Sequence, residues 1–164
     1  MEGKPPEREI PEIPRLTLRR SILKKRLIAL RGKSNVGKST ALHNLNRLLL
    51  SEPSAKTLKF QKYGRLLDFS TVIDFNGQRV GIVNRGDIAY HLDDFLTELE
   101  EERCRIIVCA ARTKGEIESV LASYARRYEV VEILKVECHD DYVDASNLEA
   151  AHQLAAYVYG SMIM

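Results

Sequence analysis

The hydrophobic positions along the chain predict strands that alternate with helices. The apolar run Leu27–Leu30 is typical of a buried strand, and we expect this strand to cover residues 27–31. Apolar residues then recur at helical spacing over about residues 38–50, and Pro53 ends that predicted helix. Residues 52–68 are polar and basic, so we interpret them as a connecting loop that could lie over a bound ligand or remain a plain surface loop.

A β-hairpin is predicted next. Residues 69–75 alternate between apolar and polar, Asn76-Gly77 is a type I′ turn signal, and the apolar run 80–83 returns along the first strand of the hairpin. The return strand is apolar enough to be central in a sheet. We therefore expect it to lie beside the strand formed by residues 27–31.

The rest of the chain continues the alternation. Two sequences have the spacing of a capping box, Thr113 to Glu116 and Ser146 to Glu149, and each is expected to open a helix. The remaining predicted elements are a helix from Ile88 to about Arg103, a strand over 105–110, a helix ending near Arg127, a strand over 129–136 and a C-terminal helix.

This order predicts an α/β fold with three layers. We expect a mainly parallel sheet of about five strands, with one antiparallel hairpin strand and helices on both faces. Residues 1–15 contain four of the five prolines and are predicted to form a flexible tail, so residues 16–164 form a single domain. Ligands of such sheets bind at the carboxyl ends of the strands, which directs attention to residues just past each strand.

One motif stands at such a position. Residues Gly32–Ser39 match the pattern G-x-x-x-x-G-K-[ST], between a predicted strand and a predicted helix. The glycines allow the backbone to turn closely around phosphates, and the helix offers its positive N-terminal end. Lys38 would reach the β- and γ-phosphates, and the Ser39 hydroxyl would hold Mg²⁺. The predicted nucleotide-binding residues are Gly32, Lys33, Ser34, Asn35, Val36, Gly37, Lys38, Ser39 and Thr40.

Two residues beyond this motif are candidates for catalysis, together with Lys38. Asp87 follows the predicted return strand and could contact Mg²⁺ or position the attacking water, although an aspartate is also a good helix N-cap. Arg112 follows a later strand and could neutralise charge on the γ-phosphate, or it could be a surface cation. Asp74 is a weaker metal candidate, because a hairpin turn should lie at the opposite end of the sheet.

Charge is distributed unevenly along the chain. Its net charge is +2, but residues 1–67 carry +11 and residues 68–164 carry −9. The basic residues of segment 15–26 could dock on nucleic acid or on an acidic protein partner, or they could fold onto the acidic half of the chain itself. The second reading is favoured, because no aromatic side chains accompany these cations.

Composition narrows the class of protein further. At 45% hydrophobic and 29% charged residues the chain is typical of a globular domain, and no apolar run is long enough to cross a membrane. The N-terminus lacks the apolar region of a secretory signal. Cys104, Cys109 and Cys138 are odd in number and lack C-x-x-C spacing. These features predict a cytoplasmic protein with reduced, structural thiols.

Residues 27–50 resemble a P-loop nucleoside triphosphatase. The segment Ser34–Ser39 is similar to that of bacterial ribosome-assembly GTPases, and the predicted hairpin is similar to the second and third strands of small GTPases. The guanine-reading tetrapeptide N-K-x-D of those proteins is missing from the sequence, which favours ATP over GTP. Lys33, directly after Gly32, resembles the signature lysine of deviant Walker ATPases. That second resemblance implies a nucleotide-dependent homodimer.

Three functions remain open from the sequence. The first is Mg²⁺-dependent hydrolysis of a nucleoside triphosphate, with ATP more probable than GTP as the substrate. The second is a nucleotide or small-molecule kinase, for which residues 52–68 and Arg112 are the available lid and cation. The third is a nucleotide-regulated binding module with negligible turnover, whose basic segment docks nucleic acid or a partner protein.

Overall fold

The computed structural model describes residues 24–33, 36–63, 68–84, 89–113 and 115–162. The described elements, in chain order, are β1 (Arg26–Arg31), α2 (Lys38–Leu50), β2 (Ala55–Lys62), β3 (Phe69–Phe75), β4 (Gln78–Asn84), α3 (Ala89–Glu101), β5 (Ile106–Ala111), α4 (Ile117–Tyr124), β6 (Glu129–Leu134), the short 3₁₀ helix η1 (Asp140–Tyr142) and α5 (Val143–Ser161). The predicted tail, residues 1–15, lies outside this part of the chain.

The strands form one mixed sheet in the order β2-β3-β4-β5-β1-β6. β1 pairs in parallel with both β5 and β6, and β4 pairs in parallel with β5, whereas β3 is antiparallel to both β2 and β4. The predicted place of the return strand is wrong, because β5 separates β4 from β1. Both β4 and β5 are apolar along most of their length, so their patterns mark them as interior strands without specifying their neighbours.

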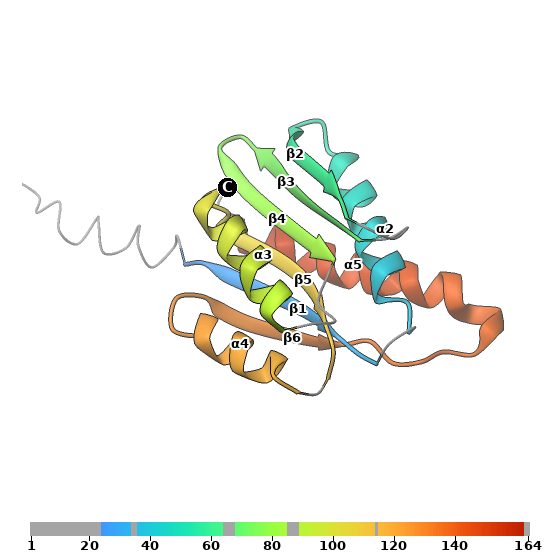
Figure 1. Cartoon of the computed structure of the whole chain (residues 1–164). Helices are drawn as coiled ribbons and strands as arrows, with labels where there is room; N and C mark the ends of the chain where they lie inside the picture. Colours follow the sequence, from blue (N-terminus) through green and yellow to red (C-terminus); the bar gives the residue numbers. More distant parts are fainter. Residues whose placement is uncertain (1–23, 34–35, 64–67, 85–88, 114, 163–164) are drawn as a thin grey trace, which may run out of the picture.

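Helices cover both faces of the sheet, which confirms the α/β class (Figure 1). The apolar faces of α2 and α5 pack on one side, around Leu42, Leu45 and Leu154. On the other side α3 and α4 pack around Leu96 and Leu121. Every side chain of β5 is buried, because this central strand is covered by helices on both faces.

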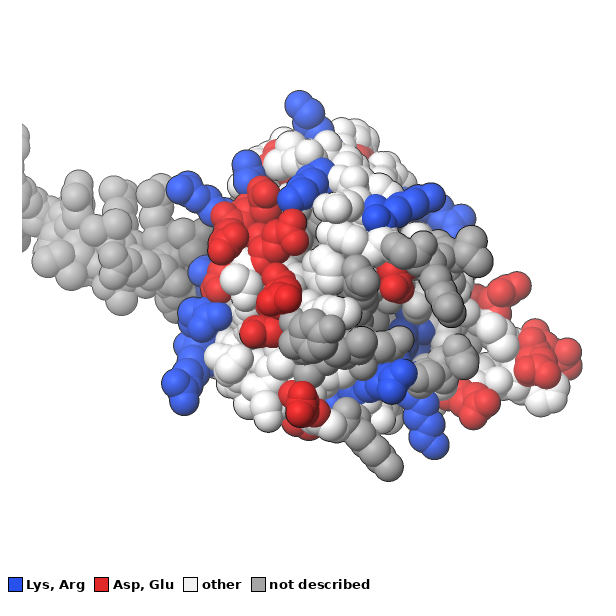
Figure 2. All heavy atoms as spheres, in the orientation of Figure 1, with Lys and Arg blue, Asp and Glu red and all other residues white. Residues whose placement is uncertain are grey.

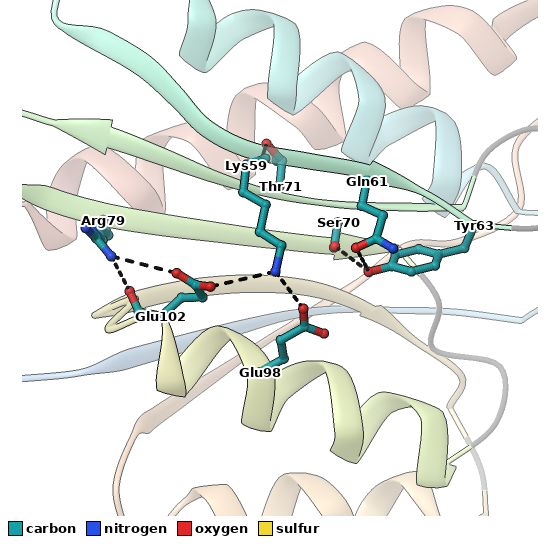
Figure 3. Close-up of polar contacts among 8 residues, drawn as sticks. All are labelled: Lys59, Gln61, Tyr63, Ser70, Thr71, Arg79, Glu98 and Glu102. Atoms are coloured by element: carbon teal, nitrogen blue, oxygen red, sulfur yellow. Dashed lines mark hydrogen bonds and ion pairs between the residues drawn. The ribbon is translucent and has the colours of Figure 1, made fainter.

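Residues 52–68 are not the loop that the sequence predicted, because they contain strand β2. It is an edge strand, and its register with β3 shifts between Thr57 and Lys59. Lys59 points from this edge toward α3, whereas the Tyr63 hydroxyl lies at Gln61 and Ser70 (Figure 3). The Lys59 ammonium lies 2.9 Å from a carboxylate oxygen of Glu98, and the Tyr63 ring packs edge-on against Phe95 of α3. A strand paired on one side is partly solvated, so its polar composition concealed it.

Neither predicted capping box forms. Helix α4 begins at Ile117 and has no side-chain hydrogen bond at its cap residue, Glu116. Helix α5 begins three residues before Ser146, directly after η1, which His139 caps by accepting a hydrogen bond from the Asp141 amide. The Ser146 hydroxyl instead accepts a hydrogen bond from a lysine beyond β6. A capping signal is therefore overridden when an earlier turn already starts the helix.

The described end of the basic segment pairs with the chain's own acidic residues. Lys24 lies 3.3 Å from a carboxylate oxygen of Glu129, and Lys25 lies 3.8 Å from one of Glu100 at the end of α3. Acidic side chains gather over α3 on the face shown in Figure 2, with lysines and arginines around them. For residues 24–26 this supports the intramolecular reading of the charge asymmetry, whereas residues 15–23 lie outside the described chain.

No helix among the described residues has both the length and the apolar composition needed to cross a lipid bilayer.

Truncating a core leucine of α2 should destabilise the fold strongly. Leu42 is fully buried between α2 and the sheet, so Leu42→Ala should lower the free energy of unfolding by about 2–5 kcal/mol. The matched control is Leu50→Ala on the same helix, because Leu50 is 39% exposed. Its cost should stay below about 1 kcal/mol. Urea denaturation followed by circular dichroism measures both, and equal losses would contradict the packing described.

Candidate phosphate-binding site

The loop between β1 and α2 begins in close contact with its neighbours. The Gly32 amide donates a hydrogen bond to the carbonyl oxygen of Ala111, 3.2 Å away, at the end of β5. A Cβ atom added to Gly32 would lie 2.6 Å from the carbonyl oxygen of Lys135, just beyond β6. Any larger residue at position 32 would therefore collide with backbone. The loop thus starts where the carboxyl ends of β1, β5 and β6 meet.

Gly37 ends the loop in a conformation that favours glycine. Its φ is +97°, in the left-handed region, and it is the N-cap residue of α2. A Cβ atom added to Gly37 would lie 2.0 Å from the amide oxygen of Asn147, a buried residue of α5. The first turn of α2 carries no acidic residue. The helix therefore presents unneutralised amide groups and a positive dipole end at this loop.

Lys38 folds back over the loop. Its side chain is buried, and its ammonium donates hydrogen bonds to the carbonyl oxygens of Gly32 and of Lys33, the latter at 2.9 Å. The ammonium therefore lies against the start of the loop, at Gly32 and Lys33. A buried cation at a helix N-terminus favours an anionic ligand, because the ammonium and the helix dipole both produce a positive potential there.

Ser39 faces Asn84, which the rule for residues just past a strand places at this edge, although the sequence analysis gave it no individual role. The Ser39 hydroxyl donates a hydrogen bond to the side-chain oxygen of Asn84, 3.3 Å away. Asn84 is the last residue of β4 and is buried. Its position directly after an apolar strand was a usable signal, since such residues lie at the carboxyl edge of the sheet. The hairpin register places Phe69 of β3 opposite Asn84, so β3 begins at the same edge.

The oxygen atoms of Ser39 and Asn84 fit the ligand preference of Mg²⁺. This ion keeps several waters and takes few protein oxygens when it is bound together with phosphates. Within the described ranges, no cluster of three or more His, Cys, Asp and Glu side chains could hold a metal ion without help from a ligand. The donor set therefore suits a cation that arrives with a phosphate rather than an independently bound metal.

Arg31 ties the β5–α4 connection to the start of the loop. Its buried guanidinium lies 2.6 Å from a carboxylate oxygen of Glu132 and 2.5 Å from one of Glu118, and it donates two hydrogen bonds to the carbonyl oxygen of Arg112. Burial would lower the pKa of Arg31, but its bonds with both carboxylates outweigh burial and raise it. The hydrogen bond between Arg31 and Glu118 also lowers the pKa of the Glu118 carboxyl. Sequence analysis missed Arg31, because an arginine ending a strand has no distinctive pattern.

The structure brings together part of the predicted site. The described nucleotide-binding candidates Gly32, Lys33, Val36, Gly37, Lys38, Ser39 and Thr40 lie at the loop and at the start of α2. Ser34, Asn35 and Asp87 lie outside the described residues, so the geometry does not test them. The exposed side chain of Arg112 follows β5, at the carboxyl edge that also carries the loop. Asp74 lies at the hairpin, where its carboxylate accepts a hydrogen bond from the Gly77 amide, at 3.2 Å.

Two of the cysteines are buried and poorly suited to chemistry. Burial raises the pKa values of Cys104 and Cys109 to about 12, so both thiols stay protonated at neutral pH. Protonated thiols are weak nucleophiles and poor metal ligands. The predicted structural role of these two residues agrees with their positions in the apolar layer under α3 and α4.

Comparison with known proteins gives this chain no relatives: no protein-family model, no curated protein and no solved structure matches it.

Substituting Gly37 should abolish phosphate binding. Gly37→Ala forces an alanine into the left-handed backbone region and places its methyl group on the Asn147 oxygen. The loop must therefore move. The matched control is Gly77→Ala in the hairpin turn, where φ is +91° and a methyl group would meet no atom within 4 Å. Both variants should lose about 1 kcal/mol of stability from backbone strain. Calorimetric titration with ATP and Mg²⁺ should show binding by the Gly77 variant and none by the Gly37 variant.

Proposed function

We propose that this protein binds a nucleoside triphosphate and hydrolyses it with Mg²⁺, and that it has a P-loop fold. The observation that carries the proposal is Lys38, a buried cation folded over the glycine loop at the N-terminus of α2. Strand, loop and helix follow one another in the order that a phosphate-binding loop requires. ATP is the favoured nucleotide because the residues after β5, from Arg112 to Glu116, lack a guanine-reading motif.

In this proposal each described residue has a defined task. The loop amides and the N-terminus of α2 bind the phosphate oxygens, which Lys38 would contact after releasing the carbonyl oxygens of Gly32 and Lys33. Bound Mg²⁺ would supply positive charge between the phosphates, with Ser39 holding it. Asn84 orients the Ser39 hydroxyl. Asp87 and Arg112 remain candidates for positioning water and neutralising the γ-phosphate.

A binding module with slow turnover is a second candidate, and Asn84 favours it. In P-loop proteins the Mg²⁺ is held by the loop hydroxyl and an aspartate, whereas the side chain that Ser39 contacts among the described residues is a neutral amide. A neutral ligand attracts a divalent cation less than a carboxylate does. Weak metal binding would leave nucleotide bound with little hydrolysis. Single-turnover and steady-state assays with ATP, GTP and candidate phosphoryl acceptors separate hydrolase, kinase and binding module.

Removing the Lys38 ammonium should remove nucleotide-dependent activity. In Lys38→Ala the loop loses the cation that would contact the β- and γ-phosphates, and we expect turnover to fall at least about a hundredfold. Phosphate release measured with ATP and Mg²⁺ provides the test. Lys56→Ala is the matched control, because Lys56 is exposed on β2, away from the loop. Unchanged turnover in the Lys38 variant would reject the role assigned to this residue.

Introducing a carboxylate beside Ser39 should strengthen metal binding. In Asn84→Asp a negative charge replaces a neutral amide of similar shape, so the nucleotide complex should bind Mg²⁺ about tenfold more tightly. Titrating Mg²⁺ into the ATP complex gives the apparent affinity. Asn76→Asp, at the exposed hairpin turn, adds the same charge far from the site. If both variants respond equally, Asn84 has no part in the metal site.

A further inference from the structure

The buried charged side chains within the described ranges are all cations. They are Arg31, Lys38 and Lys135. Arg31 has two carboxylates, Glu118 and Glu132, as partners. Lys38 contacts carbonyl oxygens and belongs to the loop itself. Lys135 has no part in the nucleotide site as derived so far, and its surroundings differ from those of Arg31.

The Lys135 ammonium is bonded to neutral oxygens. The residue is 5% exposed. Its nitrogen donates hydrogen bonds to the Ser146 hydroxyl at 2.8 Å and to the Val136 carbonyl oxygen at 3.3 Å, and the described residues supply it with no ion pair. A buried ammonium without a counter-charge is costly, because burial removes its hydration and neutral oxygens compensate incompletely. A cation in this state lacks an anionic partner.

Lys135 lies directly behind the glycine loop. Its backbone amide donates a hydrogen bond to the Arg31 carbonyl, 2.6 Å away, which keeps this residue beside the end of β1. Its carbonyl oxygen is the atom that a Cβ on Gly32 would meet. Its side chain then crosses to Ser146 of α5. The neighbouring residue, Asn147, packs against Gly37, so the segment from β6 to α5 contacts both glycines of the loop.

Asn147 gives a second, independent sign that this polar layer is incomplete. The residue is 3% exposed, and its amide oxygen, which faces Gly37, has no hydrogen-bond partner among the described residues. Buried polar atoms in folded proteins are nearly always satisfied, so such an atom often marks a functional site. The Lys135 backbone and the unsatisfied Asn147 oxygen therefore lie against the two ends of the same loop, at Gly32 and Gly37.

We propose that Lys135 is a positioning residue that supports phosphate binding from behind the loop, and that the polyphosphate of the bound nucleotide is its missing counter-charge. The inference rests on the proposed function and goes beyond it. Lys135 does not touch the ligand but acts through the loop backbone. Its field reaches the phosphates through protein of low polarity, where charges interact more strongly than in water. The substrate group that this cation recognises is the polyphosphate and not the base.

The test compares polyphosphate affinity in charge variants of Lys135. Wild-type protein, Lys135→Met, Lys135→Gln and Lys135→Arg are titrated calorimetrically with inorganic tripolyphosphate and with ATP, both in Mg²⁺. The Met variant keeps the length of the apolar stem, and the Gln variant also keeps a donor for Ser146. We expect both neutral variants to bind either ligand at least about tenfold more weakly, and Arg to restore affinity within about threefold.

Two further measurements separate this role from a structural one. The melting temperature of the ligand-free Met variant should equal or exceed that of wild type, because the variant removes an uncompensated buried charge. Lys56→Met, an exposed lysine of β2, makes the same change in net charge far from the loop. At about 0.5 M salt any effect of Lys56 should vanish, whereas the loss at Lys135 should persist, since buried charges are screened less.

Two results would overturn the inference. If the neutral variants bind tripolyphosphate as tightly as wild type while melting at lower temperature, Lys135 is a structural cation. If affinity follows hydrogen bonding rather than charge, so that Gln restores it fully, the counter-charge argument is wrong. Wild-type protein that binds neither ligand would instead reject the proposed function itself. The wild-type titration therefore distinguishes the two failures.

Discussion

The parallel pairing of β1 between β5 and β6 is the constraint on which the site depends. Parallel neighbours end at the same edge, so Arg31, Ala111 and the residue after Leu134 come together there. The loop that leaves β1 must turn within this crowded edge, and small residues at Gly32 and Gly37 permit it. Helix α2 then crosses the sheet face with its N-terminus pointing at the edge. The geometry of the candidate phosphate-binding site is thus a consequence of sheet order.

Positive charge concentrates at this edge in three different states. Arg31 is neutralised by carboxylates and holds the connection after β5 in place. Lys38 bonds to loop carbonyls that it can exchange for a ligand. Lys135 is buried against neutral oxygens. The first cation stabilises the fold, and in the proposed function the other two favour an anionic ligand at this edge.

The sequence predicted the elements better than their arrangement. The predicted strand over 27–31, the helix over about 38–50 and the hairpin around Asn76-Gly77 were correct, because glycine positions and periodicity report local geometry directly. Strand β2 was missed, since an edge strand with one solvated side has the composition of a loop. The neighbours of β1 were also wrong. Hydrophobic pattern shows that a strand is buried, but pairing depends on contacts between segments distant in sequence.

The candidate site shows the same division. The loop residues could be assigned because one motif specifies their chemistry over eight positions. Asn84, Lys135 and Asn147 come from β4, from the end of β6 and from α5, so no local pattern links them to the loop. Their proposed roles follow from burial and, for Lys135 and Asn147, from the absence of an ion pair or hydrogen bond among the described residues, which are properties of the folded chain. Neutral or satisfied residues at these positions would have given the same secondary structure.

The shifted register of β2 affects whether this edge of the sheet can pair with another molecule. Leu58 and Phe60 expose apolar surface on this outermost strand, and an open strand of that kind can recruit a strand from another molecule. The irregularity between Thr57 and Lys59 interrupts the even spacing of backbone amides and carbonyls with which a strand from another molecule would pair. Lysines at 56, 59 and 62 add mutual repulsion between copies. The irregularity and the lysines therefore protect this edge of the sheet against fibril-like stacking.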